Sequence, residues 1–325
     1  MRAAYYEKNG PARDVLSIAD VDMPRPGPGE VRVKLKVSGV NPSDVKSREG
    51  RTRKIAFPRV IPHSDGAGEI EMVGDGVPAR RLGERVWIWN AQWKRPFGTC
   101  AEYVVLPAAM AVALPAHVGF DAGACLGIPA MTAYHAVAVA GAGKGNTVLV
   151  TGGAGGVGHY AIQFAKALGA TVLTTVSSEA KAALARQAGA DHIIDYKREN
   201  VGERVMALTN KTGVDAVVEM DLAANARLYP SVLHARGSVV VYGTGSAEAP
   251  IPAQFLLVNA IAIKFVFVYE LTAEERAAAV SAITRMLETK TLINNVALSM
   301  PLNDIVAAHE AVEQGRAMGN VVVTL

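Results

Sequence analysis

The sequence is poor in cysteine, with only Cys100 and Cys125 among its 325 residues. Two thiols are too few for a disulfide framework or for a four-cysteine structural zinc site, and they are typical of a reducing compartment. The sequence also lacks a run of about 18 apolar residues that could span a bilayer, and the first residues, MRAAYYEKNG, lack the apolar core of a signal peptide. We therefore expect a soluble cytoplasmic protein with no membrane partner.

Positive charge is not concentrated anywhere in the chain, although the formal net charge is +3. The basic residues are dispersed rather than gathered into a run with interleaved aromatic residues, which argues against nucleic-acid binding. Half of the residues are hydrophobic and 19% are charged, the composition of a globular protein with a substantial core. Because a single core stops growing at roughly 250–300 residues, the 325 residues favour two domains.

The first third of the sequence is typical of β-structure. Hydrophobic residues at 31, 33, 35 and 37 alternate with basic residues at 32, 34 and 36, which predicts a strand with one buried and one solvated face. Glycines and prolines separate later short strand candidates such as GERVW and AEYVVL. The segment NVVVTL at the C-terminus is a further strand candidate.

The sequence after about residue 125 alternates short apolar segments with amphipathic helical patterns, which predicts a doubly wound parallel sheet of the Rossmann type. The helices are expected to end at Gly169, at Gly189 and near Gly237, and a later long helix is expected to begin at the N-cap Thr272. The strand candidates are TVLV, ATVLTTV, HIID, DAVVEM, GSVVVYG and AIKFVFVY.

A glycine-rich loop lies between the first of these strands and its helix, with the spacing G-x-G-x-x-G. Gly153 would permit the tight turn, Gly155 would let the backbone approach a pyrophosphate, and Gly158 would allow close packing of helix on strand. A Walker loop for ATP is excluded because no Gly-Lys-Ser/Thr ends the segment. The alternative is a glycine-rich turn without a ligand. The predicted dinucleotide-binding residues of the loop are Gly153, Ala154, Gly155, Gly156, Val157 and Gly158.

The second strand ends without the carboxylate that NADH sites use. In those sites an Asp or Glu roughly 20 residues after the loop accepts hydrogen bonds from the ribose 2′-hydroxyl. Here Ser177 follows the strand and Lys181 lies one turn into the next helix, and both could donate to a 2′-phosphate. Glu179 is the competing ribose acid, although the helix macrodipole also accounts for an acid there. The pattern favours NADPH.

At this point the chain resembles the medium-chain dehydrogenase/reductase superfamily and, within it, the zinc-free quinone oxidoreductase branch, which is zeta-crystallin-like. Asn146 departs from the branch pattern, which usually has an acidic residue, glutamine or a basic residue there. The resemblance implies a GroES-like, β-rich catalytic domain of residues 1–122 and 270–325, and a Rossmann NADPH-binding domain of residues 123–269. The matching features are Leu149, GGAGGVG, Gln163, Lys166, GVNPSD at 39–44, PHSDGAGEI at 62–70, GERVW at 83–87 and IPAMTAYHAV at 128–137.

The resemblance also bears on metal binding. In the zinc alcohol dehydrogenases of the superfamily, the segment like GVNPSD carries a cysteine ligand, and the segment like PHSDGAG has a histidine ligand two residues before its Gly-Ala pair. This chain has Asn41 and Ser64 at those positions. His63 lies one residue early, where the family has glycine. We therefore expect no catalytic metal.

Further cofactor residues follow from the resemblance. Lys181, Tyr196 and Arg316 match positions that hold the 2′-phosphate in related NADPH-using quinone reductases. Their alternatives are a solvated helix charge, a strand-end packing residue and a surface arginine. The positions that resemble the lining of the nicotinamide, or the strand end where the cofactor crosses the sheet, are Asn41, Thr132, Gly243, Thr244, Phe267 and Val268.

The activity implied by the resemblance is hydride transfer from NADPH to a quinone or a similar electron-poor acceptor. Without a metal, hydrogen-bond donors would have to stabilise the developing charge. Asn41 could orient substrate or nicotinamide, and His63 could donate a proton if it faces the cleft, with a structural role for His63 as the alternative. Many related reductases carry tyrosines in the loop at 46–60, and this sequence has none there. The open alternatives are an NADPH-dependent reductase of α,β-unsaturated ketones or enoyl thioesters and a non-catalytic, crystallin-like NADPH-binding protein.

A homodimer is expected from the segment AIAIKFVFVY, a nearly continuous apolar strand candidate at the edge of the predicted sheet. An exposed strand edge of this kind invites pairing with a second subunit. The alternative is a strand that the helices of its own subunit cover.

Overall fold

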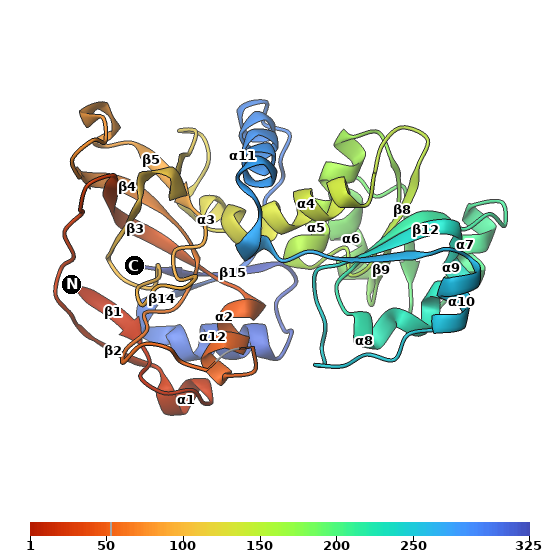
Figure 1. The fold of residues 1–325 in the computed structure, drawn as a ribbon, viewed down its shortest axis with the longest axis horizontal. Coiled ribbons are helices and arrows are strands. Elements are labelled where there is room, and N and C mark those ends of the chain that lie inside the picture. The colour runs from red at the N-terminus through yellow and green to blue at the C-terminus, as the bar shows by residue number, and fades with distance from the viewer. Residues whose placement is uncertain (53) are drawn as a thin grey trace. The chain divides into compact units, whose positions relative to one another are not determined.

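The computed structural model describes residues 1–52 and 54–325, so Arg53, in the predicted loop at 46–60, lies outside the described residues (Figure 1). The chain forms two compact units, residues 1–129 with 283–325 and residues 130–282. The domain limits expected from the sequence, 122/123 and 269/270, fall earlier in the chain. Among the residues described, each helix is too short or too polar to cross a lipid bilayer.

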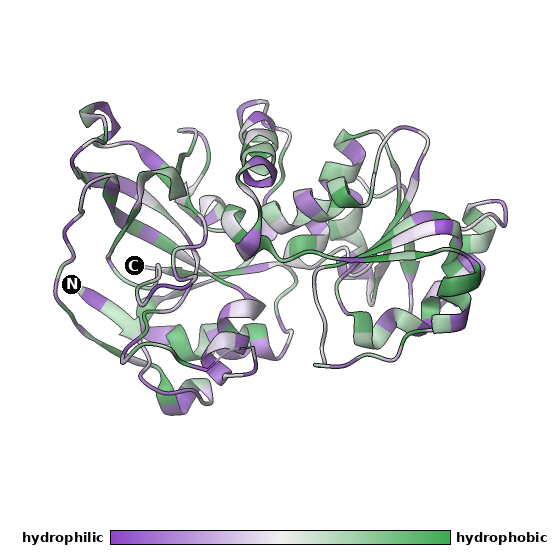
Figure 2. Ribbon diagram, viewed as in Figure 1, coloured by the Kyte–Doolittle hydropathy of each residue, from purple (hydrophilic) through white to green (hydrophobic). Residues whose placement is uncertain are grey.

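The long helix α11 (Ala273–Glu288) contains the second passage between the units. Its predicted N-cap is confirmed, because the Glu275 N–H donates to Thr272 Oγ1 (3.2 Å) and the Thr272 N–H donates to Glu275 Oε2 (2.8 Å). Hydrophobic and hydrophilic residues alternate along this helix in Figure 2, as expected of an amphipathic helix.

In the described residues, the first unit is built on a seven-stranded sheet. Six strands follow the order β14-β15-β3-β4-β5-β7, the seventh, β6, pairs with β3, and β1 and β2 form a separate pair. The C-terminal strand β15 pairs antiparallel with β3, with Val322 opposite Gly39, so the end of the chain completes this sheet. The strands are β1 (Arg2–Tyr5), β2 (Ser17–Asp20), β3 (Glu30–Val40), β4 (Asp65–Val73), β5 (Arg85–Ile88), β6 (Tyr103–Pro107), β7 (Ala111–Ala113), β14 (Val296–Pro301) and β15 (Asn320–Thr324).

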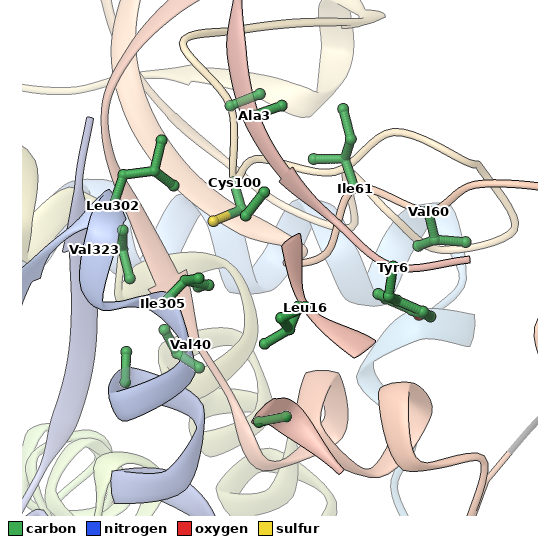
Figure 3. Close-up of a cluster of buried hydrophobic side chains, with 14 of the residues drawn as sticks. Ala3, Tyr6, Leu16, Val40, Val60, Ile61, Cys100, Leu302, Ile305 and Val323 are labelled. Carbon is green, nitrogen blue, oxygen red and sulfur yellow. The ribbon is translucent and has the colours of Figure 1, made fainter. Parts of the chain in front are cut away.

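Short helices surround this sheet. A core cluster lies where β1, β2, the end of β3 and the C-terminal helix meet, and Cys100 points into it among Ala3, Leu302 and Val323 (Figure 3). Burial raises the pKa of the Cys100 thiol, so the thiol packs as an apolar group. The helices are α1 (Ala12–Val15), α2 (Pro42–Glu49), α3 (Phe120–Gly123) and α12 (Ile305–Glu313), with the short helical turns η1 (Ala79–Arg81), η2 (Ala108–Met110), η3 (Leu126–Ala130) and η6 (Leu302–Asp304).

The predicted alternation along 31–37 is confirmed in β3 with one exception. Val31, Val33 and Leu35 are buried, whereas Lys34 is exposed. Arg32 was expected to be solvated but is only 6% exposed. Its guanidinium donates to Glu71 Oε2 (2.7 Å) and to the carbonyl of Pro24 (3.0 Å), and these contacts replace water.

The second unit contains the predicted Rossmann sheet, with six parallel strands in the order β10-β9-β8-β11-β12-β13. This is the doubly wound order, in which the chain reverses direction across the sheet between β8 and β11. The candidate AIKFVFVY forms a shorter strand than expected, because the pairing with β12 ends at Phe265. The strands are β8 (Thr147–Val150), β9 (Thr171–Val176), β10 (His192–Asp195), β11 (Val214–Glu219), β12 (Leu233–Val241) and β13 (Ala262–Phe265).

Helices cover both faces of this sheet, as its buried side chains require. Leu149 and Val217 belong to a core shared with α7 and α9, whereas their neighbours Val148 and Val218 are equally buried. Both faces of this parallel sheet are therefore covered. The helices are α4 (Met131–Val139), α5 (Gly156–Ala167), α6 (Glu179–Gln187), α7 (Val201–Leu208), α8 (Leu222–Asn225), α9 (Tyr229–Val232) and α10 (Ala253–Val258), with the turns η4 (Ala226–Leu228) and η5 (Val268–Glu270).

Two of the three helix stops are where the sequence predicts them. Gly169 (φ +90°) and Gly189 (φ +96°) follow α5 and α6 in the left-handed conformation that favours glycine. The third prediction is wrong, because the helical segment after β11 ends at Val232 rather than near Gly237. Leu233 pairs with Val214, which brings Gly237 into β12.

Candidate functional site

The glycine-rich loop joins β8 to α5 and needs its glycines for two different reasons. A Cβ added to Gly158 would lie 2.3 Å from the carbonyl oxygen of Gly152, and one added to Gly153 would lie 2.1 Å from Thr174 Oγ1. These two positions are therefore restricted by packing. Gly155 is exposed, and a Cβ there would meet only the Gly152 oxygen, at 3.3 Å. Its open side is where a ligand can approach the backbone.

The loop is held against β9 on one side. The Gly152 N–H donates to Thr175 Oγ1 (3.1 Å), and the Gly153 N–H donates to the carbonyl of Thr175 (3.2 Å). Ala154 is only 3% exposed and packs into the turn. Residues 156–158 then form the first turn of α5, whose N–H groups point out of the helix end and favour an anion.

Three residues predicted to hold a 2′-phosphate meet at the carboxyl end of β9. Lys181 Nζ donates to Ser177 Oγ (3.0 Å), so the cation and the hydroxyl form one polar group. Tyr196 follows β10, and its N–H donates to the carbonyl of Val176 (3.1 Å) beside Ser177. The Tyr196 side chain is 52% exposed, so its ring remains accessible. Because all three belong to the second unit, their proximity is a property of that unit alone.

The competing ribose acid, Glu179, is engaged elsewhere. Glu179 Oε1 lies 2.7 Å from Arg186 Nη1, and both side chains are exposed. The hydrogen bond from Arg186 lowers the pKa of Glu179, and the more distant Arg198 acts in the same direction. Lys181 therefore contacts Ser177 after the end of β9, while Glu179 on α6 is paired with Arg186.

On its other side the loop contacts a buried carboxyl that the sequence analysis did not single out. Glu219, the last residue of β11, has no exposed surface. Its Oε1 accepts from Thr151 Oγ1 (3.0 Å), the Asp221 N–H (2.7 Å) and Asn225 Nδ2 (2.8 Å), and its Oε2 accepts from Tyr229 Oη (3.3 Å). An acid that follows the apolar residues Ala216, Val217 and Val218 near the carboxyl end of the DAVVEM strand was the available signal.

Gly243 and Thr244 follow β12 at the same edge of the sheet. A Cβ added to Gly243 would lie 2.3 Å from the Met220 oxygen, and the Gly243 carbonyl accepts from the Leu222 N–H (3.2 Å). Thr244 Oγ1 donates to the carbonyl of Ser246 (2.8 Å) and closes the turn. The two predicted residues thus lie beside the connection from β11 to α8.

Three further predicted nicotinamide residues lie in the second unit at different levels of burial. Phe267 and Val268 follow β13 rather than belonging to a strand, with Phe267 53% exposed and Val268 5% exposed. Thr132 lies in the first turn of α4 and is 6% exposed. Phe267 is therefore the one of the three that offers a large accessible surface.

In the first unit, Asn41 is the N-cap of α2 and is almost fully buried. Its N–H donates to Asp44 Oδ2 (2.8 Å), and its side-chain Nδ2 donates to Asp65 Oδ2 (2.8 Å). Burial raises the pKa of Asp65 well above its ordinary value, while the hydrogen bond from Asn41 acts in the opposite direction. The amide of Asn41 is thus oriented by the buried carboxyl.

His63 is enclosed in the first unit rather than exposed to a ligand. It has no exposed surface, its Nδ1 lies 2.8 Å from Ser38 Oγ, and its Nε2 lies 2.9 Å from His309 Nε2. Burial lowers the pKa of His63 to about 3. Its backbone has φ +77°, which explains why glycine suits this position in the family. These contacts fit the structural alternative, so His63 is left out of the site proposed below.

The remaining predicted residue, Arg316, also belongs to the first unit. It is exposed just after α12, and its N–H donates to the carbonyl of Ala311 (3.1 Å). The loop, Ser177, Lys181 and Tyr196 are thus brought together within the second unit. Asn41 and Arg316 are positioned within the first.

Known proteins are similar to this chain over its whole length. Residues 27–116 match the model of the alcohol dehydrogenase GroES-like domain, and residues 156–285 match that of the zinc-binding dehydrogenases. Human quinone oxidoreductase is 32% identical over 331 residues, which cover 100% of this chain and 98% of the human protein. The chain belongs to the medium-chain dehydrogenase/reductase superfamily. Within that superfamily it falls in the quinone oxidoreductase branch, so it is an oxidoreductase. The predicted fold class is confirmed.

Solved structures of the superfamily agree with this fold. A mycobacterial protein complexed with NADPH has a TM-score of 0.89 and 29% identity, with both chains covered completely. An NAD-dependent alcohol dehydrogenase has a TM-score of 0.91 and 29% identity, again over both complete chains. The similarity of the backbones therefore does not show whether this chain prefers NADPH or NADH. That preference depends on the side chains at the end of β9.

The zinc-binding description of the matched family model does not fit the side chains of this chain. Asn41 is committed to Asp65, and Ser64 is a hydroxyl that is only 1% exposed. Over residues 1–52 and 54–325, His, Cys, Asp and Glu nowhere gather in a group of three or more that could hold a metal ion. The donors that a tetrahedral zinc site needs are not assembled in the described part of the chain.

Proposed function

We propose that this reductase transfers hydride from NADPH to a quinone or a similar electron-poor acceptor, without zinc. The observation that carries the proposal is the glycine-rich loop at the carboxyl end of β8, with the Ser177–Lys181 pair at the neighbouring strand end. The loop offers backbone N–H groups and a helix N-terminus to a pyrophosphate. The pair offers a cation and a hydroxyl to a 2′-phosphate.

The preference for NADPH over NADH depends on charge at the end of β9. Lys181 and Ser177 are already oriented by their 3.0 Å hydrogen bond, and Tyr196 lies next to them. Glu179, the alternative ribose acid, forms a 2.7 Å ion pair with Arg186, which offsets its negative charge. A 2′-phosphate would therefore meet donors and cations, whereas a ribose diol would lack its usual acid.

Hydride transfer without a Lewis acid restricts the acceptor. When bound, NADPH supplies the hydride, and the acceptor must delocalise the resulting negative charge, as quinones and activated alkenes do. The residues of this chain would bind and orient the two reactants. Asn41 is the proposed orienting group, because its buried contact with Asp65 holds its amide in one direction. Solvent is the proposed proton source in place of His63.

The cofactor proposal is tested by fluorescence titration with NADPH and NADH. Wild-type protein should bind NADPH more tightly, and Lys181→Ala should weaken NADPH binding roughly 10- to 100-fold, the effect of losing one charge-assisted hydrogen bond. NADH binding should change little. Lys211→Ala, an exposed lysine before the amino end of β11, is the matched control. Tighter binding of NADH by the wild type would overturn the proposal.

The acceptor is tested by following NADPH oxidation with a panel of quinones, enones and enoyl thioesters. We expect turnover with quinones by protein that has been washed with chelator. Turnover only with enones or enoyl thioesters would replace the acceptor class while leaving the cofactor proposal intact. Stoichiometric zinc in the washed protein would contradict the zinc-free mechanism. If the protein binds NADPH but no acceptor oxidises it, the proposed activity is replaced by that of a non-catalytic NADPH-binding protein.

We also propose a homodimer formed through the outer edge of β13. This strand is last in the sheet order, and Phe265 on it is 72% exposed. Leu257 (81%) and Val258 (71%) at the end of α10 extend the exposed apolar surface, and α10 is largely green in Figure 2. Pairing with a second copy would cover such an edge. Sedimentation should show a dimer at micromolar concentration that Phe265→Lys dissociates, and a wild-type monomer would reject this assembly.

A further inference from the structure

Glu219 is a buried acid that the proposed hydride transfer does not use. It is the last residue of β11, next to the start of the glycine-rich loop, and has no surface exposed to solvent. A carboxyl group in such a place is costly unless its oxygens are satisfied. Its four hydrogen bonds come from four segments: Thr151 after β8, Asp221 in the β11–α8 connection, Asn225 at the end of α8 and Tyr229 in α9.

The first branch of this network leads into the glycine-rich loop. Thr151, the residue before the loop glycines, donates its hydroxyl to Glu219 Oε1 (3.0 Å). The same oxygen of Thr151 accepts from the Met220 N–H (2.9 Å), so its hydroxyl proton is directed toward Glu219 or the neighbouring Val218 carbonyl. Thr151 thereby fixes the point from which the loop leaves the sheet.

The second branch leads to the loop that follows β12. The Asp221 N–H donates to Glu219 Oε1 (2.7 Å), and Asp221 Oδ1 accepts from the Gly245 N–H (2.8 Å). Asp221 also caps α8 by accepting from the Ala224 N–H (3.3 Å). The orientation of Asp221, and with it the turn at Gly245, therefore depends on the buried carboxyl.

We infer that Glu219 is a positioning residue that holds the loop at 151–155 and the loop at 243–246 in register across β11. This inference rests on the proposed NADPH site, because both loops contain predicted cofactor residues. Glu219 itself lies below the surface and acts through Thr151 and Asp221. Its oxygens serve as hydrogen-bond acceptors, and three donors converge on Oε1.

Two substitutions of Glu219 distinguish its role as a hydrogen-bond acceptor from the role of its charge. In Glu219→Gln the amide oxygen can replace Oε1 and keep its three donors, while the new NH2 faces Tyr229 Oη, which can turn to accept. In Glu219→Leu the volume is similar but the donors are left unsatisfied. Val214→Ala, at the buried start of the same strand, is the matched control for general loosening of β11.

Amide hydrogen exchange on the unliganded protein is the first test. We expect Glu219→Leu to raise exchange roughly 10-fold or more in peptides covering 151–155 and 243–246, and Glu219→Gln to restore protection to about the wild-type level. Val214→Ala should leave both loops protected. Unchanged exchange in Glu219→Leu, or equal loosening in Glu219→Gln, would overturn the inference.

A second measurement separates this inference from the proposed function. Glu219→Leu should raise the Kd and the KM for NADPH about 10-fold while changing kcat much less, because positioning affects cofactor binding before chemistry. If wild-type protein fails to bind NADPH, the proposed function fails, yet the exchange experiment still tests Glu219. If Glu219→Leu does not fold, Asp221→Ala replaces it and should loosen 243–246 and the start of α8 while leaving 151–155 protected. Protection of 243–246 in that variant would reject the second branch.

Discussion

In each unit of the molecule a fully buried carboxyl group lies beside residues of the proposed site, but these two groups, Asp65 and Glu219, are satisfied differently. In the first unit, Asp65 Oδ2 accepts from Asn41 Nδ2, and burial is the main influence on the pKa of Asp65, raising it well above its ordinary value. In the second unit, burial also raises the pKa of Glu219, but Asn225, Asp221, Thr151 and Tyr229 all donate to it and oppose that effect.

The two acids are equally deep but differ in the number of side chains that donate to them, one at Asp65 and three at Glu219. Both side chains have 0% exposure. Hydrogen bonds donated to a carboxyl group favour its ionised form, so the four donors at Glu219 oppose the effect of burial, as the bonds from Asn41 and the Ile128 backbone do at Asp65. Asp65 acts as the contact that orients Asn41, and Glu219 acts as a multiple acceptor that joins loops.

The largest predicted effect tests the protonation of Asp65. Because its folded pKa is raised, its contribution to stability is complete below the unfolded pKa near 4 and is lost as pH rises toward the folded pKa. Wild-type protein should lose about 1.4 kcal/mol of unfolding free energy per pH unit in this window, relative to Asp65→Asn. Denaturant unfolding from pH 4 to pH 8 measures the difference. Parallel pH profiles for the two proteins would show that Asp65 ionises normally.

The second prediction concerns low pH, because two buried histidines of the first unit should make the protein less stable as pH decreases. Burial lowers the pKa of His63 to about 3 and that of His309 well below its ordinary value, so both stabilise the fold when neutral. Stability is complete above the unfolded pKa of about 6.5 and falls as pH decreases, by about 2 kcal/mol per histidine at pH 5. His309→Gln should remove about half of the pair's loss, as measured by urea unfolding at pH 7 and pH 5. An unchanged acid slope would mean that the pair is protonated in the native state.

The third prediction compares one closely packed glycine from each unit. A Cβ at Gly127 would lie 2.4 Å from Asp65 Oδ1, and one at Gly158 would lie 2.3 Å from the Gly152 oxygen. Each alanine substitution should destabilise its unit by about 1–3 kcal/mol through overpacking. Gly158→Ala should also weaken NADPH binding, and more strongly than Gly127→Ala, whose effect would have to pass through Asp65 to Asn41. Thermal unfolding and fluorescence titration distinguish these effects, and equal loss of affinity in both variants would contradict the assignment of the loop.

Local signals in the sequence account for most of the fold. The alternation along β3, the apolar segments of the Rossmann sheet and the glycines after α5 and α6 depend on neighbours in the chain, so periodicity and backbone preference reveal them. The end of the segment after β11 was misplaced, because the pairing of Leu233 with Val214 overrides the glycine signal at Gly237. Tertiary pairing decided that boundary.

The site was less predictable where its contacts join distant segments. The glycine-rich loop and the Ser177–Lys181 pair lie in one continuous stretch of the sequence. The spacing of these residues along it indicates a dinucleotide site. The contact of His63 with His309 joins residues 246 positions apart, and that of Thr151 with Glu219 joins residues 68 positions apart. No period or motif encodes such pairs, so the burial of His63 and the network at Glu219 required coordinates.

The smallest predicted effect sharpens the comparison of the two acids. Tyr229 makes the longest hydrogen bond to Glu219 (3.3 Å) and is the only one of the four donors on Oε2, so Tyr229→Phe should cost about 0.5–1 kcal/mol. Adding Asn225→Leu removes a second donor and should raise the pKa of Glu219 further. If donors are what distinguish the two acids, the double variant should lose stability more steeply than the wild type as pH rises, because the pKa of Glu219 is raised further. A flat difference between double variant and wild type from pH 4 to pH 8, in denaturant unfolding, would show that something other than these donors sets the charge of Glu219.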